Sequence, residues 1–99
     1  MDSVTLPTLD TYQELQEPRL YRVLLHNDDY TTMEFVVQVL QTVFGKTEAE
    51  AYAIMMRVHK EGVGECGVYT SEIAETKVQL VHSLARKNSF PLQASMEEV

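Results

Sequence analysis

The sequence lacks the features that would place it in several large protein classes. Cys66 is its only cysteine, so no intramolecular disulfide can form and a reducing compartment is expected. No apolar run approaches the roughly 18 to 20 residues that cross a bilayer. The first residues have neither the basic start nor the apolar core of a signal peptide. These absences predict a soluble protein of a cytoplasm-like space.

Basic residues are also scarce, with 8 Lys and Arg against 15 Asp and Glu, for a net charge of −7. This balance argues against non-specific nucleic-acid binding, in which Lys and Arg neutralise phosphates. It leaves room for a cationic ligand or a basic partner surface. The sequence also lacks the nucleophile elbow, the phosphate loop, the dinucleotide fingerprint and the C-x-x-C pair, so no common catalytic motif suggests an enzyme.

The 99 residues, 44% of them hydrophobic, are typical of one small globular domain. Residues 1–19 have no sustained periodicity and include Pro7 and Pro18, which predicts an acidic, mobile extension. Residues 20–99 are predicted to form the folded core.

Periodicity and capping signals divide this core into six elements. Thr31 and Glu34 read as a capping box at the start of a first helix, and Thr47 and Glu50 read as a second. Gly45 stands where a left-handed helix end is expected. The expected strands are 20–25, 63–69 and 92–96, and the third helix runs from Thr70 or Ser71 to Asn88. This β-α-α-β-α-β order predicts an α+β fold, with a small three-stranded antiparallel sheet packed on three helices.

In the expected second strand, Gly64 and Gly67 suggest a bulge. Strict alternation would place Cys66 and Val68 on one face of that strand.

A polar corner follows the first strand at Asn27-Asp28-Asp29, residues that favour turns because their side chains bond nearby backbone. His59 ends the second helix, and the two ends can meet in a small βααβ unit. Amide, carboxylate and imidazole acceptors together suit an ammonium group, which offers three donors. Four apolar residues can form a pocket wall beside them, although spacing alone also fits an ordinary core: Met33, Val36, Met55 and Val58.

The sequence also contains residues that could form a catalytic or a metal site. Cys66 with His59 would make a nucleophile and base, but a lone Cys on a strand is more often a buried thiol. Asp28 and Asp29 would make an acid and base pair, but neighbours on a turn usually point apart. The candidate metal ligands have no preset spacing, so no metal is predicted: His26, Asp28, Asp29, His59 and His82.

The segment Tyr21 to Val36, which contains N-D-D-Y-T, resembles the opening of the ClpS adaptor family. Further similarity lies in Val58-His59 with Gly62, in Cys66 to Thr70, in Glu72 to Val78 and in Pro91-Leu92. The resemblance covers about residues 20 to 97 without a large gap. The N-D-D-Y-T and A-E-T-K blocks together make it specific.

The resemblance implies a non-enzymatic adaptor without a cofactor. Such adaptors bind substrates that begin with Phe, Tyr, Trp or Leu and deliver them to a ClpA- or ClpC-type AAA+ unfoldase, which feeds the ClpP protease. A monomer in the bacterial cytoplasm is expected, or in the plastid stroma if a transit peptide has been removed. No nucleic acid and no membrane is an expected partner.

The resemblance also implies roles for individual residues. Asn27, Asp28, Asp29 and His59 would surround the substrate's α-amino group, with Asp29 the closer carboxylate. Glu72 and Lys77 would dock on the unfoldase, and the N-terminal extension would serve in substrate hand-off. Met33 would restrict the shape of the pocket. The hydrophobic pocket would comprise Leu25, His26, Thr31, Met33, Val36, Met55, Val58 and Leu92.

The sequence departs from the family at two positions. Thr32 stands where Pro is common, and His26 stands where an aliphatic residue is common. Two functions of other classes also fit these residues: an interaction module of the same fold without an amine pocket, and a metal-dependent enzyme using Asp28, Asp29 and His59.

Overall fold

The computed structural model describes residues 18–99, in which six elements follow the predicted β-α-α-β-α-β order. They are β1 (Leu20–His26), α2 (Met33–Thr42), α3 (Glu48–Glu61), β2 (Val63–Thr70), α4 (Ser71–Lys87) and β3 (Gln93–Glu98). The predicted α+β class is therefore confirmed. The extension expected over residues 1–19 lies outside the described residues except for Pro18 and Arg19, so the division at residue 20 stays a prediction.

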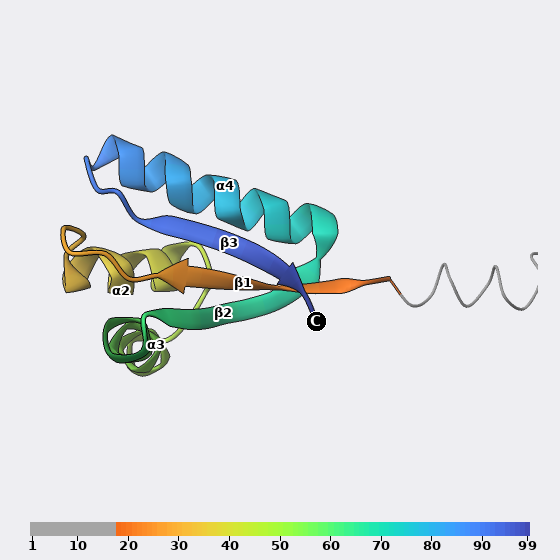
Figure 1. The fold of residues 1–99 in the computed structure, drawn as a ribbon, viewed down its shortest axis with the longest axis horizontal. Helices are drawn as coiled ribbons and strands as arrows, with labels where there is room; N and C mark the ends of the chain where they lie inside the picture. Colours follow the sequence, from red (N-terminus) through yellow and green to blue (C-terminus); the bar gives the residue numbers. More distant parts are fainter. Residues whose placement is uncertain (1–17) are drawn as a thin grey trace, which may run out of the picture.

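The three strands form one antiparallel sheet with β1 in the centre, in the order β2-β1-β3 (Figure 1). Val23 and Leu25 of β1 are fully buried towards the helices, as expected for a central apolar strand. Arg22 and Leu24 alternate with them and are only half-buried. The sheet thus turns one face to the core and positions the carboxyl end of β1 beside α2 and α3.

Strand β2 contains a bulge that the glycines on either side of Cys66 suggested. Val23 pairs with Gly67 but Leu24 pairs with Glu65, so Cys66 has no partner on β1. The extra residue reverses the alternation of the strand. Cys66 is consequently 1% exposed while Val68 is 42% exposed, and the prediction that these two side chains share a face was wrong.

One predicted helix cap is confirmed by the structure and another was wrong. Helix α3 has the predicted capping box, because the Thr47 hydroxyl accepts from the Glu50 N–H and the Glu50 carboxylate accepts from the Thr47 N–H. Helix α2 is capped by Thr32, whose hydroxyl accepts from the Phe35 N–H, and not by Thr31 as predicted. Gly45 is left-handed, with φ 65°, but lies beyond the cap at Val43.

The core lies between the sheet and the helices, and its largest fully buried side chains are Leu25, Leu40, Leu92, Val23, Val39, Val81 and Cys66. Gly64 is also buried and lets α3 approach β2 closely. A Cβ on Gly64 would lie 2.7 Å from Cγ2 of Val58 and 3.3 Å from the carbonyl oxygen of Ile54. The absence of a side chain here therefore sets the position of the Val58 turn of α3.

Candidate functional site

The end of β1 and the end of α3 meet, as the sequence suggested. The backbone N–H of Asn27 donates to the carbonyl of Gly62 at 2.9 Å. Gly62 caps α3 in the left-handed region, with φ 89°, and its own N–H donates to the Val58 carbonyl. Glycine adopts this conformation without a Cβ penalty. This pair of backbone contacts brings the polar turn at 27–29 next to the last turn of α3, which carries His59.

Asp28 organises the loop between β1 and α2. Its carboxylate accepts from the Tyr30 N–H at 2.8 Å, the Thr31 N–H at 2.7 Å and the Thr31 hydroxyl at 2.7 Å. Partial burial opposes ionisation, but the hydrogen bonds from Thr31 and Tyr30 outweigh it, and the pKa of Asp28 lies below its ordinary value. Thr31 is thereby committed to Asp28, which explains why the helix begins with Thr32 as its cap.

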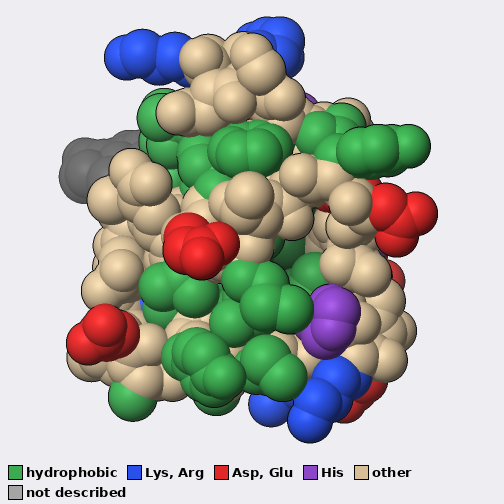
Figure 2. All heavy atoms as spheres, turned by 90° about the vertical axis from the view of Figure 1, so that its left-hand side faces the viewer, with side chains coloured by type: hydrophobic (Ala, Val, Ile, Leu, Met, Phe, Trp, Pro, Cys, Tyr) green, Lys and Arg blue, Asp and Glu red, His purple; other side chains and the backbone are tan. Residues whose placement is uncertain are grey.

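A cleft of about 230 Å³ opens at this corner, between the loop, α2 and α3. Figure 2 shows a hollow on this end of the molecule, with hydrophobic side chains around it and a histidine at its edge. Val36, Met55 and Val58 form buried walls, while Met33 is 43% exposed at the mouth. The complete lining is Asn27, Asp28, Asp29, Thr31, Met33, Val36, Met55, Val58 and His59.

The polar part of this lining is exposed at Asn27, Asp29 and His59. Whereas Asp28 is held by three hydrogen bonds, the structure of residues 18–99 records none to the side chain of Asp29. A carboxylate, a side-chain amide and an imidazole thus line one edge of an apolar cleft. Together they provide acceptors for a group with several N–H donors.

Three residues expected in the pocket do not line the cleft: Leu25, His26 and Leu92. Leu25 is fully buried in the core, consistent with a place behind the wall. The Nε2 of His26 lies 2.6 Å from the hydroxyl oxygen of Ser95, across from β1 on β3. Leu92, 2% exposed, contributes to a separate recess with His82 and Phe90. The local pattern gave no sign of the contact between His26 and Ser95, because these residues lie 69 positions apart in the sequence.

Glu72 and Lys77 both lie on α4, away from the cleft lining. Glu72 is exposed in the first turn of this helix. The Lys77 ammonium donates to the carbonyl of Val43, the cap of α2, at 2.7 Å. It also lies 5.6 Å from the centre of the Tyr69 ring, within the range of a cation–π contact. Lys77 therefore fastens α4 to the end of α2, a contact that sequence spacing does not reveal.

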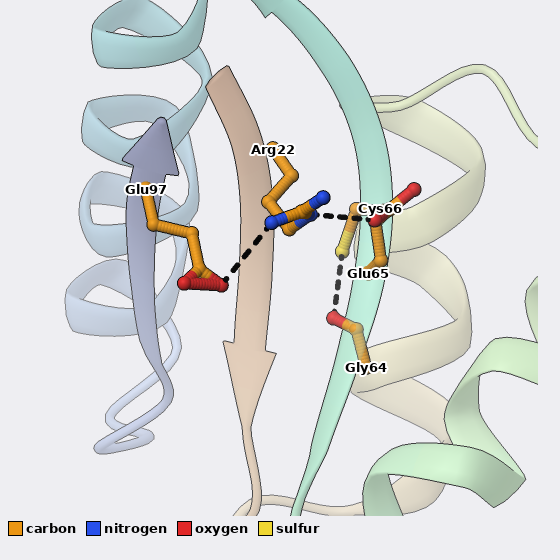
Figure 3. A network of polar contacts seen from close by, with 5 residues as sticks. All are labelled: Arg22, Gly64, Glu65, Cys66 and Glu97. Carbon is orange, nitrogen blue, oxygen red and sulfur yellow. Dashed lines mark hydrogen bonds and ion pairs between the residues drawn. The ribbon is translucent and has the colours of Figure 1, made fainter. Parts of the chain in front are cut away.

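Cys66 points away from solvent on the bulge of β2 (Figure 3). Burial raises the pKa of its thiol to about 12, so it stays protonated at neutral pH and is a poor nucleophile. On the other face of the sheet, Arg22 lies between Glu65, at 3.0 Å, and Glu97, at 3.7 Å. Exposed pairs of this kind contribute little, at roughly 0 to 1 kcal/mol each.

Two features are absent from residues 18–99, the part of the chain that the structure describes. Within that range no three His, Cys, Asp or Glu side chains are grouped so that they could hold a metal ion. No helix in the same range is long and apolar enough to cross a membrane.

The fold and the cleft define a class of small α+β proteins with an apolar pocket under a polar edge. Residues 16–95 match the family model for the ATP-dependent Clp protease adaptor protein ClpS. The chain belongs to the ClpS family, as the resemblance in its sequence predicted.

Named relatives agree with this assignment. The ATP-dependent Clp protease adapter protein ClpS of Nitratidesulfovibrio vulgaris (strain DSM 19637 / Miyazaki F) is 64% identical over 86 residues, covering 87% of this chain and 86% of that protein. The protein of the same name from Desulfatibacillum aliphaticivorans is 58% identical over 96 residues, covering 97% and 88%. Agrobacterium tumefaciens ClpS2, solved bound to L-phenylalaninamide, is 40% identical with a TM-score of 0.81, covering 84% of this chain and 100% of that one.

Proposed function

We propose that this Clp protease adaptor binds the free α-amino group and the bulky first side chain of substrates that begin with Phe, Tyr, Trp or Leu. It then delivers them to a ClpA- or ClpC-type unfoldase for degradation by ClpP. The observation that carries the proposal is the cleft itself, in which polar acceptors stand beside buried apolar walls. The ligand of Agrobacterium tumefaciens ClpS2 supports it, because L-phenylalaninamide has a free amine and a Phe side chain.

The polar half of the cleft selects the amine. Asn27, Asp29 and His59 would accept the three N–H donors of the ammonium, and the Asp29 charge would offset the cost of removing that cation from water. Asp28 would act mainly through the loop, since its oxygens already accept hydrogen bonds from Tyr30 and Thr31. This division supports Asp29 as the closer carboxylate.

The apolar half selects the side chain. Val36, Met55 and Val58 would surround it, and burying a Phe or Leu side chain contributes roughly 1.5 to 3 kcal/mol. Methionine is flexible and polarisable and contacts aromatic rings favourably, so one pocket can accept both shapes. Neither half needs a cofactor or a metal.

For delivery, we propose that the face of α4 with Glu72 and Lys77 docks on the unfoldase. Glu72 is exposed. Lys77 is half-buried and uses one donor on Val43, which leaves donors for a partner. The protein would act as a monomer in the cytoplasm.

A series of peptides with different first residues tests the proposed choice of side chain. Labelled peptides that differ only in beginning with Phe, Leu or Val should separate in fluorescence anisotropy, with Phe and Leu at least about tenfold tighter than Val, because Val buries less apolar surface and branches at Cβ. Equal binding of all three would leave the family assignment standing and contradict a pocket that selects the first side chain. Metal-dependent activity that a chelator abolishes would favour the enzyme alternative.

Substitution of Met33 should broaden this selectivity. Met33→Ala removes bulk at the mouth of the cleft, so peptides that begin with Ile or Val should gain about tenfold relative to Phe, a change of roughly 1.4 kcal/mol. Met33→Leu keeps most of the volume and serves as the matched control. An unchanged ranking of first residues in Met33→Ala would show that this side chain does not set the shape limit.

Removal of residues 1–18 should separate binding from delivery. The cleft lining begins at Asn27, so the shortened protein should bind a Phe peptide normally in anisotropy. Degradation of a Phe-tagged substrate by the unfoldase and protease should slow, because the family resemblance assigns this segment to hand-off. Loss of peptide binding would instead place the segment in the binding site, and undiminished degradation would remove its role in delivery.

A further inference from the structure

A second apolar groove, of about 380 Å³, lies beside the cleft between α2 and α3. Its lining is Met33, Glu34, Val37, Tyr52 and Met55. Met33 and Met55 line both hollows, so these two side chains form a shared wall between them. In Figure 2 hydrophobic side chains continue from the hollow across the surface below it.

The groove is formed by one row of side chains from each helix. Met33 and Val37 are one turn apart on α2, and Tyr52 and Met55 are three residues apart on α3, spacings that align side chains along a helix face. Met33 is 43% exposed and Tyr52 is 57% exposed. Large apolar surface is therefore left uncovered directly beside the proposed pocket.

We propose that this groove binds the second side chain of the peptide whose first residue occupies the cleft, with a preference for long apolar chains such as Leu or Met. The inference rests on the proposed function. Neighbouring side chains of an extended peptide lie about 3.3 Å apart along the chain and point to opposite sides. Met33 and Met55 then stand between the two side chains and contact both.

The second side chain of the peptide is the expected occupant because the groove is continuous with the cleft. A peptide held by its amine at Asn27, Asp29 and His59 must leave the cleft over its mouth, where Met33 lies. The groove begins at that residue. Its walls at Val37 and Tyr52 match an apolar side chain, and the carboxylate of Glu34, also in the lining, would repel an acidic one.

The test compares peptides that begin Phe-Leu and Phe-Gly, together with N-acetylated Phe-Leu, in the full-length protein. Phe-Leu should bind about tenfold more tightly than Phe-Gly, as expected for burying part of one apolar side chain. Tyr52→Ser should reduce that ratio to about threefold or less, because it removes a wall that belongs to the groove and not to the cleft. Gln41→Ser, at an exposed position of α2 outside both hollows, is the matched control and should keep the ratio.

The outcomes separate this inference from the proposed function. Equal affinity of Phe-Leu and Phe-Gly, or a ratio that Tyr52→Ser leaves unchanged, overturns the second subsite while discrimination against the acetylated peptide still supports the amine pocket. Loss of that discrimination overturns the proposed function and the subsite with it. A change in oligomeric state of Tyr52→Ser, measured by light scattering, would assign the groove to a second copy of the chain and overturn the inference.

Discussion

A labelled peptide that begins with Phe will lose at least about 30-fold in affinity when its α-amino group is acetylated, since two unpaired polar groups at about 1 to 3 kcal/mol each correspond to that factor or more. Acetylation removes the positive charge and two of the three donors while leaving the Phe side chain intact. Asn27, Asp29 and His59 would then face a ligand whose single remaining N–H can pair with only one of them. Fluorescence anisotropy with the two peptides measures the ratio.

Alanine variants identify the residues of the protein that cause the preference for a free amine. Three substitutions should each lower the affinity for the free-amine peptide and reduce the ratio of its affinity to that of the acetylated peptide: Asn27→Ala, Asp29→Ala and His59→Ala. All three side chains are exposed, so these variants should fold. Thr42→Ala, at an exposed position at the end of α2, is a control outside the cleft. Equal binding of both peptides to the unchanged protein would contradict an amine site.

Local signals predicted the parts of the fold that depend on neighbours three or four residues apart. The Thr47 and Glu50 capping box forms because both partners lie within one turn. At α2 two threonines are adjacent, and either satisfies the sequence signal for a cap. Asp28 decides between them by accepting hydrogen bonds from Thr31, which leaves Thr32 to cap the helix. Competition between alternative side-chain partners is not visible in a spacing pattern.

Contacts between distant residues account for the remaining differences. The cleft was anticipated because topology brings the end of β1 to the end of α3, and the Asn27 to Gly62 hydrogen bond joins them. The attachment of Lys77 to Val43 spans 34 residues, and nothing in the helix period of α4 indicates it. The bulge at Cys66 depends on how β2 pairs with β1, so glycines could suggest it but could not fix which side chains it turns outward.

The two neighbouring carboxylates should have different roles, with Asp28 contributing to the stability of the fold and Asp29 to peptide binding. Asp28→Ala should lower the free energy of unfolding by about 1 to 2 kcal/mol, a range typical of losing a side chain that caps backbone N–H groups. Asp29→Ala should change it by less than about 0.5 kcal/mol, because Asp29 is exposed and its side chain has no hydrogen bond among residues 18–99. The same substitution should weaken binding of the Phe peptide. Urea unfolding and anisotropy on the same preparations measure both quantities. A larger stability loss in Asp29→Ala than in Asp28→Ala would reverse the assignment of roles.

The pH dependence of Asp28→Ala supplies a second criterion with a fixed sign. Because folding lowers the pKa of Asp28 below 3.8, the ionised carboxylate stabilises the native state, and this contribution is fully present above that value. It is lost as the pH falls through the lower pKa of the folded state, since both states then bind the proton. The difference in unfolding free energy between the unchanged protein and Asp28→Ala should therefore be constant near neutral pH and shrink in acid. A difference that persists or grows in acid would mean that Asp28 acts through packing, and the loop hydrogen bonds would not be the source of its effect.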